Sequence, residues 1–461
     1  MSHRRHCFLV ATLLLAGCAY HPNGDKPATE LPATLATTGE TAAIWPNTDW
    51  WQGFGSAELD ALIATAQDRN LDLAAAAARV RQAAALARVA EAPLLPAVGI
   101  AADASRQSTN GSSGAVSGSY AEATLTASYE LDLWGRVSAN AAAARSLIEA
   151  SRYARETVAL TTVAAVAGTY FQVLGARERL AIARDDLVNA REVLRIVAAR
   201  ARNGAALTRE VVQQQALVAT REAAIPPLAQ AETEALAALA LLLDRPPQGF
   251  TVGAGSLDGI ASPAVAPGLP AALLTRRPDI AEAEARLAAA DADIAAARAA
   301  MLPRIDLSGL AGVQEAVVSG GTGGGGLLYM LGAGLTRPIF DNGALAGRRD
   351  YTIAQREELV ARYRSTVLAA LADVQKALHA TDHAARQQQA QEQAVADSRR
   401  AFALAESEYR AGAADLLTVL DTARTLYAAQ DALAQTRLVR LQALVALFKA
   451  LGGGWQQGGA A

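Results

Sequence analysis

The sequence predicts a mostly α-helical protein with a small transmembrane β part. Three observations predict this class: an Ala-rich composition, two very long segments with heptad periodicity, and four segments in which polar and apolar residues alternate. The chain has 461 residues, of which 52% are hydrophobic, 5% aromatic and 19% charged. Roughly a quarter of them are Ala, the residue with the highest helix propensity. The composition therefore favours long, closely packed helices.

Charge and side-chain chemistry exclude several classes of function. The formal net charge of −3 provides no basic surface for nucleic acid. Two Cys are too few for a disulfide framework or a Cys-rich metal site. His379 and His383 lie four residues apart, but no His-Glu-x-x-His pattern is present, and a solvated helix face is the simpler interpretation. We therefore expect no enzyme, no catalytic residue, no metal and no cofactor other than a covalent lipid.

The N-terminus predicts export and lipidation. Phe8–Ala16 is apolar but too short to span a bilayer as a helix, and it follows two arginines, as in a signal peptide. Leu15-Ala16-Gly17-Cys18 then matches a bacterial lipoprotein signal, which predicts cleavage after Gly17 and acyl chains on Cys18. An ordinary secretory signal with an incidental Cys is the alternative. Ala19, which replaces the Asp that favours inner-membrane retention, indicates the outer membrane.

The chain repeats itself at an offset of roughly 207 residues, which predicts a duplicated architecture. Leu95-Pro96 aligns with Leu302-Pro303, and the segment around Gly204 aligns with the one around Gly412. The predicted boundaries are a signal peptide (1–17), a lipid anchor with an extended linker (18–54), a first repeat (55–245), a linker (246–270), a second repeat (271–451) and a flexible C-terminal tail (452–461).

Each half contains two predicted strands. From Tyr120 to Leu133 polar and apolar residues alternate strictly, which predicts a strand with one wet and one apolar face. The four predicted strands cover residues 97–109, 119–133, 305–318 and 327–340. Their length of about 11–14 residues suffices to cross a bilayer at a tilt, although a soluble hairpin over helices is the alternative. Four strands cannot close a barrel, but two copies would supply eight strands and three would supply twelve.

Each half also contains a long helix and a return helix, predicted at 139–202, 208–243, 344–410 and 415–451. Val166, Val173 and Leu180 recur every seven residues, with Ala three positions after several of these sites, as in a coiled-coil seam. Gly204 and Gly412 are expected to end the long helices, each roughly 95 Å in length. Pro226-Pro227 is expected to divide a return helix into two segments.

Five motifs in order carry a resemblance to the outer membrane efflux protein family of the TolC type, and more closely to its NodT-like lipoprotein branch in RND efflux systems. They are Trp50-Trp51-Gln52-Gly53-Phe54, Tyr129-Glu130-Leu131-Asp132-Leu133-Trp134-Gly135-Arg136, Arg276-Arg277-Pro278-Asp279-Ile280, Pro338-Ile339-Phe340-Asp341-Asn342-Gly343 and Tyr409-Arg410-Ala411-Gly412. The resemblance covers essentially all of the mature chain.

The resemblance implies a homotrimer with a twelve-stranded β-barrel in the outer membrane, continuous with a long periplasmic α-helical barrel. Such a channel passively conducts drugs and other toxic small molecules from an inner-membrane RND-type pump, bridged by a periplasmic adaptor. The implied surroundings are outer-membrane lipid and the periplasm of a Gram-negative bacterium, with no nucleic acid. A type I protein secretion duct and a coiled-coil structural lipoprotein without a pore are the alternatives.

The resemblance also implies that the two helix turns are periplasmic tips, which form the gate and dock the adaptor. The residues that it places there are Arg202, Gly204, Arg209, Glu210, Tyr409, Arg410, Gly412, Asp415 and Asp421. Relatives often have Arg two residues after the second glycine, where this chain has Ala414. Arg209, Arg410 or Arg424 could supply the cation of the latch instead. The alternative is that these charges merely solvate the helix ends, as is usual for exposed pairs.

Overall fold

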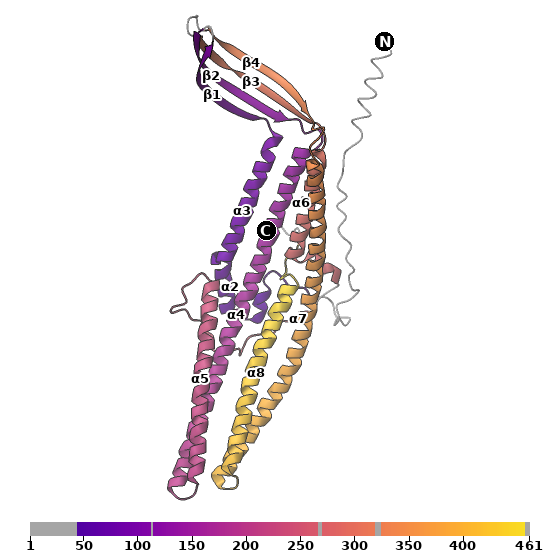
Figure 1. Cartoon of the computed structure of the whole chain (residues 1–461). Helices are drawn as coiled ribbons and strands as arrows, with labels where there is room; N and C mark the ends of the chain where they lie inside the picture. Colours follow the sequence, from indigo (N-terminus) through magenta and orange to yellow (C-terminus); the bar gives the residue numbers. More distant parts are fainter. Residues whose placement is uncertain (1–43, 112–113, 266–269, 319–323, 457–461) are drawn as a thin grey trace. The chain divides into compact units, whose positions relative to one another are not determined.

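The structure, a computed structural model, describes residues 44–111, 114–265, 270–318 and 324–456 (Figure 1). Contacts divide the chain into two compact units, which are described separately. As far as the described residues extend, unit 1 contains residues 78–152 and 282–364, and unit 2 contains residues 44–77, 153–281 and 365–456. The units therefore do not follow the two sequence repeats, since each unit contains segments of both.

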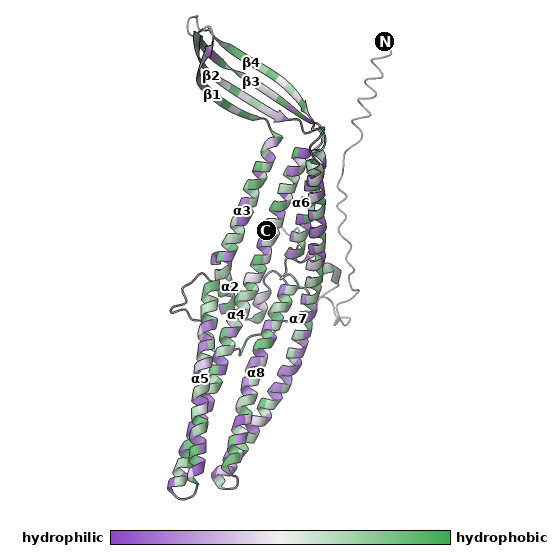
Figure 2. Cartoon of the chain, in the orientation of Figure 1, coloured by the Kyte–Doolittle hydropathy of each residue, from purple (hydrophilic) through white to green (hydrophobic). Residues whose placement is uncertain are grey.

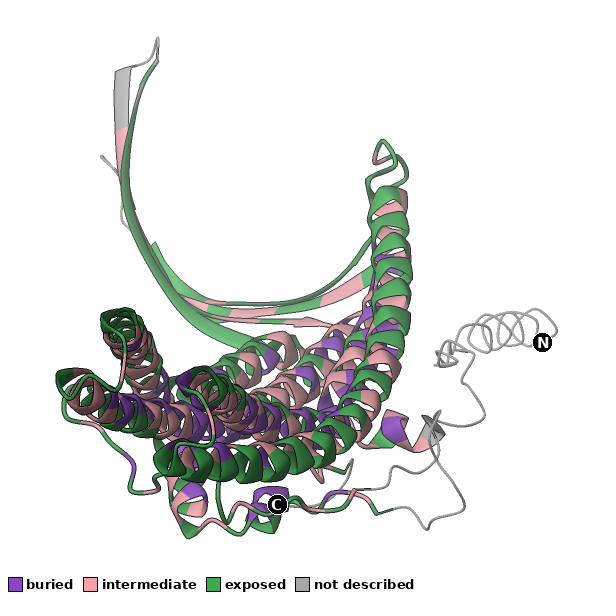
Figure 3. Ribbon diagram, turned by 90° about the horizontal axis from the view of Figure 1, so that it is seen from below, coloured by how far each residue is buried: buried purple, intermediate pink, exposed green. Residues whose placement is uncertain are grey.

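Unit 1 contains a four-stranded antiparallel sheet with strand order β1-β2-β3-β4. Its strands are β1 (Ala97–Gly111), β2 (Gly114–Glu130), β3 (Arg304–Val318) and β4 (Gly324–Thr336). Within each repeat the two strands form a hairpin, and β2 pairs with β3 to join the two hairpins. This pairing explains why the repeats do not form separate compact units. The sheet is strongly curved, and most of its residues are exposed (Figure 3).

Two strands end earlier than the alternation predicts. β2 ends at Glu130 rather than at residue 133, because the Asp132 carboxylate accepts hydrogen bonds from the backbone N–H groups of Val137 (2.9 Å) and Ser138 (2.8 Å) at the start of the next helix. β4 ends at Thr336 rather than at residue 340, before Pro338, which has no N–H group to donate. Asp341 then caps the second long helix through the N–H of Leu345 at 2.9 Å.

The two long helices are α4 (Arg136–Arg202) and α7 (Ala344–Ala411), and their return helices are α5 (Thr208–Leu242) and α8 (Leu416–Ala450). The remaining α-helices with described bounds are α2 (Ala57–Arg69), α3 (Leu71–Glu91) and α6 (Pro278–Ala299). By length and composition, α4 is the one described helix that could cross a membrane, and 56% of its most apolar stretch is buried. That burial is also typical of a core helix.

The predicted heptad seam is confirmed in α4. Val166, Val173, Leu180 and Leu187 are all buried, as are the small residues at the intervening positions, Ala176, Ala183 and Ala190. Large side chains opposite small ones allow helices to approach closely, as in coiled coils. The prediction that Pro226-Pro227 divides the return helix is wrong, because α5 continues through both prolines.

The core of unit 2 is built around an aromatic cluster. The 3-10 helix η1 (Trp50–Phe54) inserts Phe54, which has no exposed surface, against Phe171 of α4 at 5.0 Å between ring centroids. Trp50 stacks on Phe448 of α8 at 4.8 Å and 15°. Residues 50–54 therefore do not belong to an extended linker, because aromatic rings of this size contribute strongly when they are buried.

The C-terminal segment is also packed where the structure describes it, up to residue 456. Trp455 packs edge-on against Tyr153, with 5.7 Å between the ring centroids. Gly452, Gly453 and Gly454 all have positive φ angles, and a side chain at any of them would collide with a neighbour. The prediction of a flexible tail is wrong for residues 452–456, because this run of glycines lets the backbone turn closely against the core.

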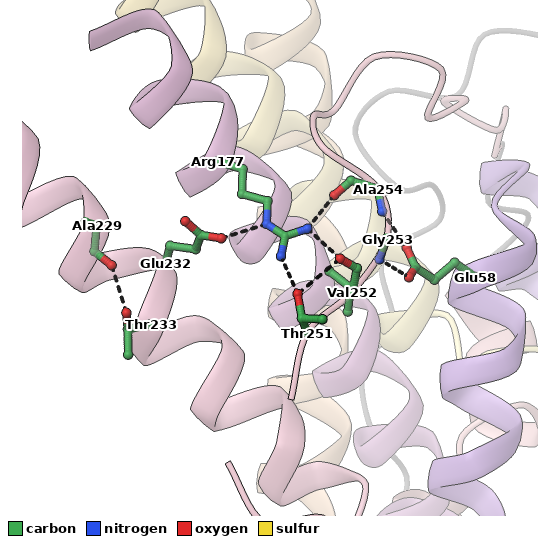
Figure 4. A network of polar contacts seen from close by, with 9 residues as sticks. All are labelled: Glu58, Arg177, Ala229, Glu232, Thr233, Thr251, Val252, Gly253 and Ala254. Atoms are coloured by element: carbon green, nitrogen blue, oxygen red, sulfur yellow. Dashed lines mark hydrogen bonds and ion pairs between the residues drawn. The ribbon is translucent and has the colours of Figure 1, made fainter. Parts of the chain in front are cut away.

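A polar clamp holds the described part of the linker to unit 2 (Figure 4). Arg177 of α4 pairs with Glu232 of α5 at 2.7 Å, and it donates to the backbone oxygens of Val252 and Ala254, each at 2.7 Å. Glu58 of α2 accepts the N–H groups of Gly253 and Ala254. Burial opposes ionisation of Glu58, but these hydrogen bonds, one from Tyr170 and the charge of Arg177 together hold its pKa below the ordinary value. Both kinds of backbone group of the linker are therefore held: its C=O groups accept from Arg177, and its N–H groups donate to Glu58.

Replacing the central ring of the aromatic cluster should destabilise unit 2. We expect Phe54→Ala to lower the stability by about 3–5 kcal/mol, because it leaves a cavity among rings that cannot fully collapse. Thermal unfolding of the detergent-solubilised protein measures the loss. Gln52→Ala, at an exposed position of the same 3-10 helix, is the control and should leave the midpoint unchanged. Equal midpoints for the two variants would contradict this view of the core.

Candidate functional site

Two surfaces are candidates for function: the faces of the sheet in unit 1 and the two helix turns in unit 2. The strand register places alternate residues of all four strands on a common face. Ile100 lies opposite Leu125, Leu125 opposite Ala311, and Ala311 opposite Tyr329. The exposed large apolar side chains of this face are Val98, Ile100, Leu125, Leu307, Val313, Val317, Leu327, Tyr329, Leu331 and Leu335.

Large apolar side chains are strongly exposed on this face. Leu327, Tyr329 and Leu331 are each at least 85% exposed in the single chain. Exposed apolar side chains gathered on one face mark contact with a membrane or with another protein. Along each strand apolar residues are interspersed with polar ones (Figure 2).

The opposite face of the sheet is polar. Asp103, Tyr120, Glu122 and Gln314 lie on it by register. The Tyr120 hydroxyl hydrogen-bonds to the Glu122 carboxylate, and its oxygen lies 3.5 Å from the side-chain oxygen of Gln314. An apolar and a polar face on one sheet are what a transmembrane barrel strand requires, with lipid on one side and water on the other.

The sheet is open at both sides. β1 pairs only with β2, and β4 pairs only with β3, within the described residues. The outer edges of β1 and β4 therefore present unpaired N–H and C=O groups. In lipid such groups cost several kcal/mol each. The single chain is thus incomplete as a membrane protein.

The turns at the other candidate surface have the same construction. Gly204 and Gly412 adopt φ angles of 71° and 78° after the two long helices. In each turn the next residue donates its N–H to a carbonyl five residues earlier, Ala205 to Arg200 and Ala413 to Glu408, both at 2.8 Å. This is the Schellman arrangement, in which a left-handed residue ends a helix. The repeat therefore extends to the hydrogen bonds of the turns.

Beneath the turns, apolar residues of the two hairpins pack together. Val197 of α4, Tyr409 of α7 and Val419 of α8 belong to one buried cluster. Tyr409 is only 6% exposed, and the guanidinium of Arg200 lies 4.6 Å above its ring. Tyr409 is thus a packing residue that joins the hairpins of its own chain.

Half of the six charged residues expected at the tips have partners within the chain. Arg410 pairs with Glu406 at 2.6 Å, and Asp421 pairs with Arg424 at 3.0 Å. Asp415 caps α8: the hydroxyl and the N–H of Thr418 both donate to its carboxylate, which lowers the pKa of Asp415. Arg424 is therefore already engaged with Asp421 on the same helix.

Three of the expected tip residues have no such partner. Within the described residues, the side chains of Arg202, Arg209 and Glu210 form no hydrogen bond or ion pair. Arg202 and Arg209 are exposed, Glu210 is half-buried, and Ala414 is half-buried in the other turn. These three side chains are free to contact another molecule. Cys18 lies outside the described residues.

One motif fixes the junction between strand and helix, a role that was not predicted from the sequence. Arg136 forms a two-pronged ion pair with Glu130, at 2.8 and 2.5 Å, and the indole N–H of Trp134 donates to the carbonyl of Pro303 at 2.7 Å. Together with the Asp132 cap, these contacts fix the end of β2 to the start of α4. The signal was a charged and aromatic cluster placed directly after an alternating segment.

His379 and His383 do stack on each other, with 6.1 Å between their ring centroids. However, among the described residues no group of three or more His, Cys, Asp or Glu is placed to hold a metal ion. On α7, His379 is half-buried and His383 is exposed, and we assign the pair no metal.

The chain is similar to known outer membrane efflux proteins over most of its length. The model of the family described as outer membrane efflux protein matches residues 62–245 and 269–453. The pyoverdine export outer membrane protein OpmQ of Pseudomonas putida is 45% identical over an alignment of 475 positions that covers 99% of each chain. The outer membrane protein OprJ of Pseudomonas aeruginosa is 33% identical, over 99% of this chain and 98% of OprJ.

Solved structures agree with these relatives. The open state of the outer membrane channel MtrE of Neisseria gonorrhoeae superposes with a TM-score of 0.84 at 29% identity, over 95% of this chain and 99% of MtrE. The outer-membrane channel OprN superposes with a TM-score of 0.82 at 28% identity, over 94% of this chain and all of OprN. The fold is thus the TolC-like fold that the sequence predicts, and the chain belongs to the outer membrane efflux protein family.

Proposed function

We propose that the chain is one subunit of a homotrimeric outer-membrane channel that passively conducts small molecules out of the cell. The observation that carries the proposal is the open four-stranded sheet with one exposed apolar face. Three copies would supply twelve strands, pairing β1 of each subunit with β4 of the next. Closure would satisfy both open edges, and the apolar face would meet lipid.

The names of the relatives support small molecules as the class of cargo. Their names describe pyoverdine export and the efflux of toluene and antibiotics. All of these are small molecules, which favours small-molecule efflux over polypeptide secretion. The channel performs no covalent chemistry in this proposal, and an inner-membrane pump supplies the energy.

The proposed partners are a periplasmic adaptor and an inner-membrane RND-type pump. The helix turns are the proposed contact surface, because Arg202, Arg209 and Glu210 project unpaired charges there. Asp421 and Arg424 form only an exposed pair, which costs little to exchange for a new partner. Tyr409 supports the tip from inside rather than acting as a latch, because it is buried in its own chain.

A lipid anchor on Cys18 completes the proposal, with the chain held at the outer membrane and projecting into the periplasm. Its support is the Leu15-Ala16-Gly17-Cys18 signal.

A charge on the apolar face of the sheet should prevent pore formation. Leu331 and Met330 are neighbours on β4 and both are exposed, at 88% and 60%, but they lie on opposite faces. We expect Leu331→Arg to abolish pores in planar lipid bilayers, because Arg facing lipid near the midplane costs about 2–4 kcal/mol per copy. Met330→Arg, the matched control on the polar face, should still form pores. Equal loss in both variants, or in neither, would contradict the assigned lipid face.

Removing two acids at the tips should increase the ion leak of the channel. In a closed tip each of these acids would form one exposed pair with a neighbouring subunit, worth about 0.2–1 kcal/mol, so Asp421→Ala with Glu210→Ala should raise the open population about two- to thirtyfold. The open probability in single-channel recordings, together with the total leak conductance, measures this change. Glu234→Ala with Asp397→Ala, which removes two exposed acids of α5 and α7 away from the turns, should have no effect. Unchanged conductance in the tip variant would count against a gate at these residues.

Lipidation can be tested with the two cysteines of the chain. We expect Cys18→Ser to abolish incorporation of labelled palmitate, because it removes the thiol that the lipoprotein signal presents for acylation. Cys7→Ser should incorporate label normally, because cleavage after Gly17 removes this residue. Labelling of the Cys18→Ser variant would exclude the proposed anchor.

A further inference from the structure

A pocket of about 390 Å³ opens within unit 2, between α4, α7, α8 and the start of α6. Its volume lies in the range of sites for small organic ligands. The pocket exists because small residues face it from the helices. Its lining consists of Thr157, Leu160, Thr161, Arg277, Pro278, Asp279, Asp373, Lys376, Ala377, Ala380, Ala446, Lys449 and Ala450.

The distribution of lysines points to this pocket. The chain has 42 basic residues, and only three of them, at positions 26, 376 and 449, are lysines. Lys26 lies outside the described residues, and the other two both line the pocket. They come from different helices, Lys376 from α7 and Lys449 from α8. A chain that otherwise uses arginine thus places both of its described lysines at one site.

The two ammonium groups are not neutralised within the described part of the chain. Neither Lys376 nor Lys449 forms an ion pair there, and both side chains are exposed. The two acids of the lining are engaged with Arg277 instead. Arg277 pairs with Asp279 at 2.6 Å and lies 3.6 Å from Asp373. With three cations and two acids, the lining carries a net positive charge.

Capping of the helix end does not explain the lysines. Lys449 lies in the last turn of α8, where a cation is favourable next to the exposed carbonyls. However, Arg277 already donates to the carbonyl of Ala450 at 3.2 Å. Lys376 lies in the middle of α7, far from either end of that helix. Both lysines line the pocket, and helix capping does not explain why lysine is found at the two positions.

The pocket opens on the uncovered side of these helices. Val374 and Leu447 are buried against Leu273 on one side of α7 and α8. Lys376, Ala380, Ala446 and Lys449 are exposed on the other side. Irregular segments of unit 2 gather along one side of its helices (Figure 3). In a channel built as proposed above, the uncovered side of the helices would line the passage.

The chemistry of the lining defines the ligand. Two ammonium groups attract an anion, and the hydroxyl of Thr161, which has no partner among the described residues, supplies a further donor. Apolar side chains of alanine, leucine and proline form much of the remaining wall, and an inorganic ion would leave them without contact. Lysine binds carboxylates as a flexible point charge, whereas arginine forms fixed two-pronged pairs. Lysine therefore suits a ligand that must be released again.

We propose that this pocket is a binding site for carboxylate-bearing small molecules on the wall of the channel, with Lys376 and Lys449 as the anion-binding groups. The position of the site in the passage rests on the proposed function, but binding itself does not. The site would hold anionic cargo transiently and would favour anions over cations in transit.

Titration calorimetry of the full-length, detergent-solubilised protein with citrate tests the proposal. We expect the wild type to bind citrate and Lys376→Gln with Lys449→Gln to bind it at least about tenfold more weakly, as loss of charged hydrogen bonds predicts. Ala380→Met keeps both charges but fills the pocket, and it should also weaken binding. Arg399→Gln with Arg400→Gln removes two exposed cations elsewhere on α7 and should bind citrate normally.

Bilayer recordings on the same preparations separate this proposal from the proposed function. The lysine double variant should still form pores, with a reversal potential shifted towards cation selectivity. Pores without citrate binding by the wild type would overturn the site and leave the channel intact. Citrate binding that is equal in the wild type and in the lysine variant would also overturn it. Lysine-dependent binding by a protein that forms no pores would support the site and contradict the channel.

Discussion

The backbone of a sheet in lipid must have all its hydrogen bonds satisfied, and the rest of this structure depends on that constraint. β2 and β3 satisfy each other across the two halves of the chain, which is why the sequence repeat does not fold into two separate domains. β1 and β4 are left with open outer edges. A chain with such a sheet can enter a membrane only by pairing those edges with other copies.

The sequence motifs connect this sheet to the helices and hold the helices in register. Asp132 and Asp341 each cap the start of the long helix of their half by accepting a backbone N–H from its first turn. Phe54 and its neighbouring rings fix the middle of unit 2, and the Arg177 clamp holds the linker across α4 and α5. At the turns, Gly204 and Gly412 close the helices with matching hydrogen bonds. The duplicated sequence thus produces the same kinds of helix cap and helix-ending turn in both halves, around one shared sheet.

Much of this architecture could be predicted from the sequence because it follows periodicity. Alternation identified the strands to within a few residues, and the heptads identified the buried seam of α4. The predictions were wrong where individual residues decide how a strand ends, whether a helix continues or how a tail packs. Asp132 leaves the strand to cap a helix, Pro226-Pro227 fit within a continuous helix, and the glycines at 452–454 pack a tail that composition presents as flexible. The pocket could not be predicted, because its lysines lie 73 residues apart in the chain and only the fold brings them together.

If three open sheets close one another, the native mass of the mature protein extracted in mild detergent should be that of a trimer, with β1 of each subunit paired to β4 of its neighbour. A stable monomer would rule this closure out, because the edges of β1 and β4 would then remain open and no channel could form.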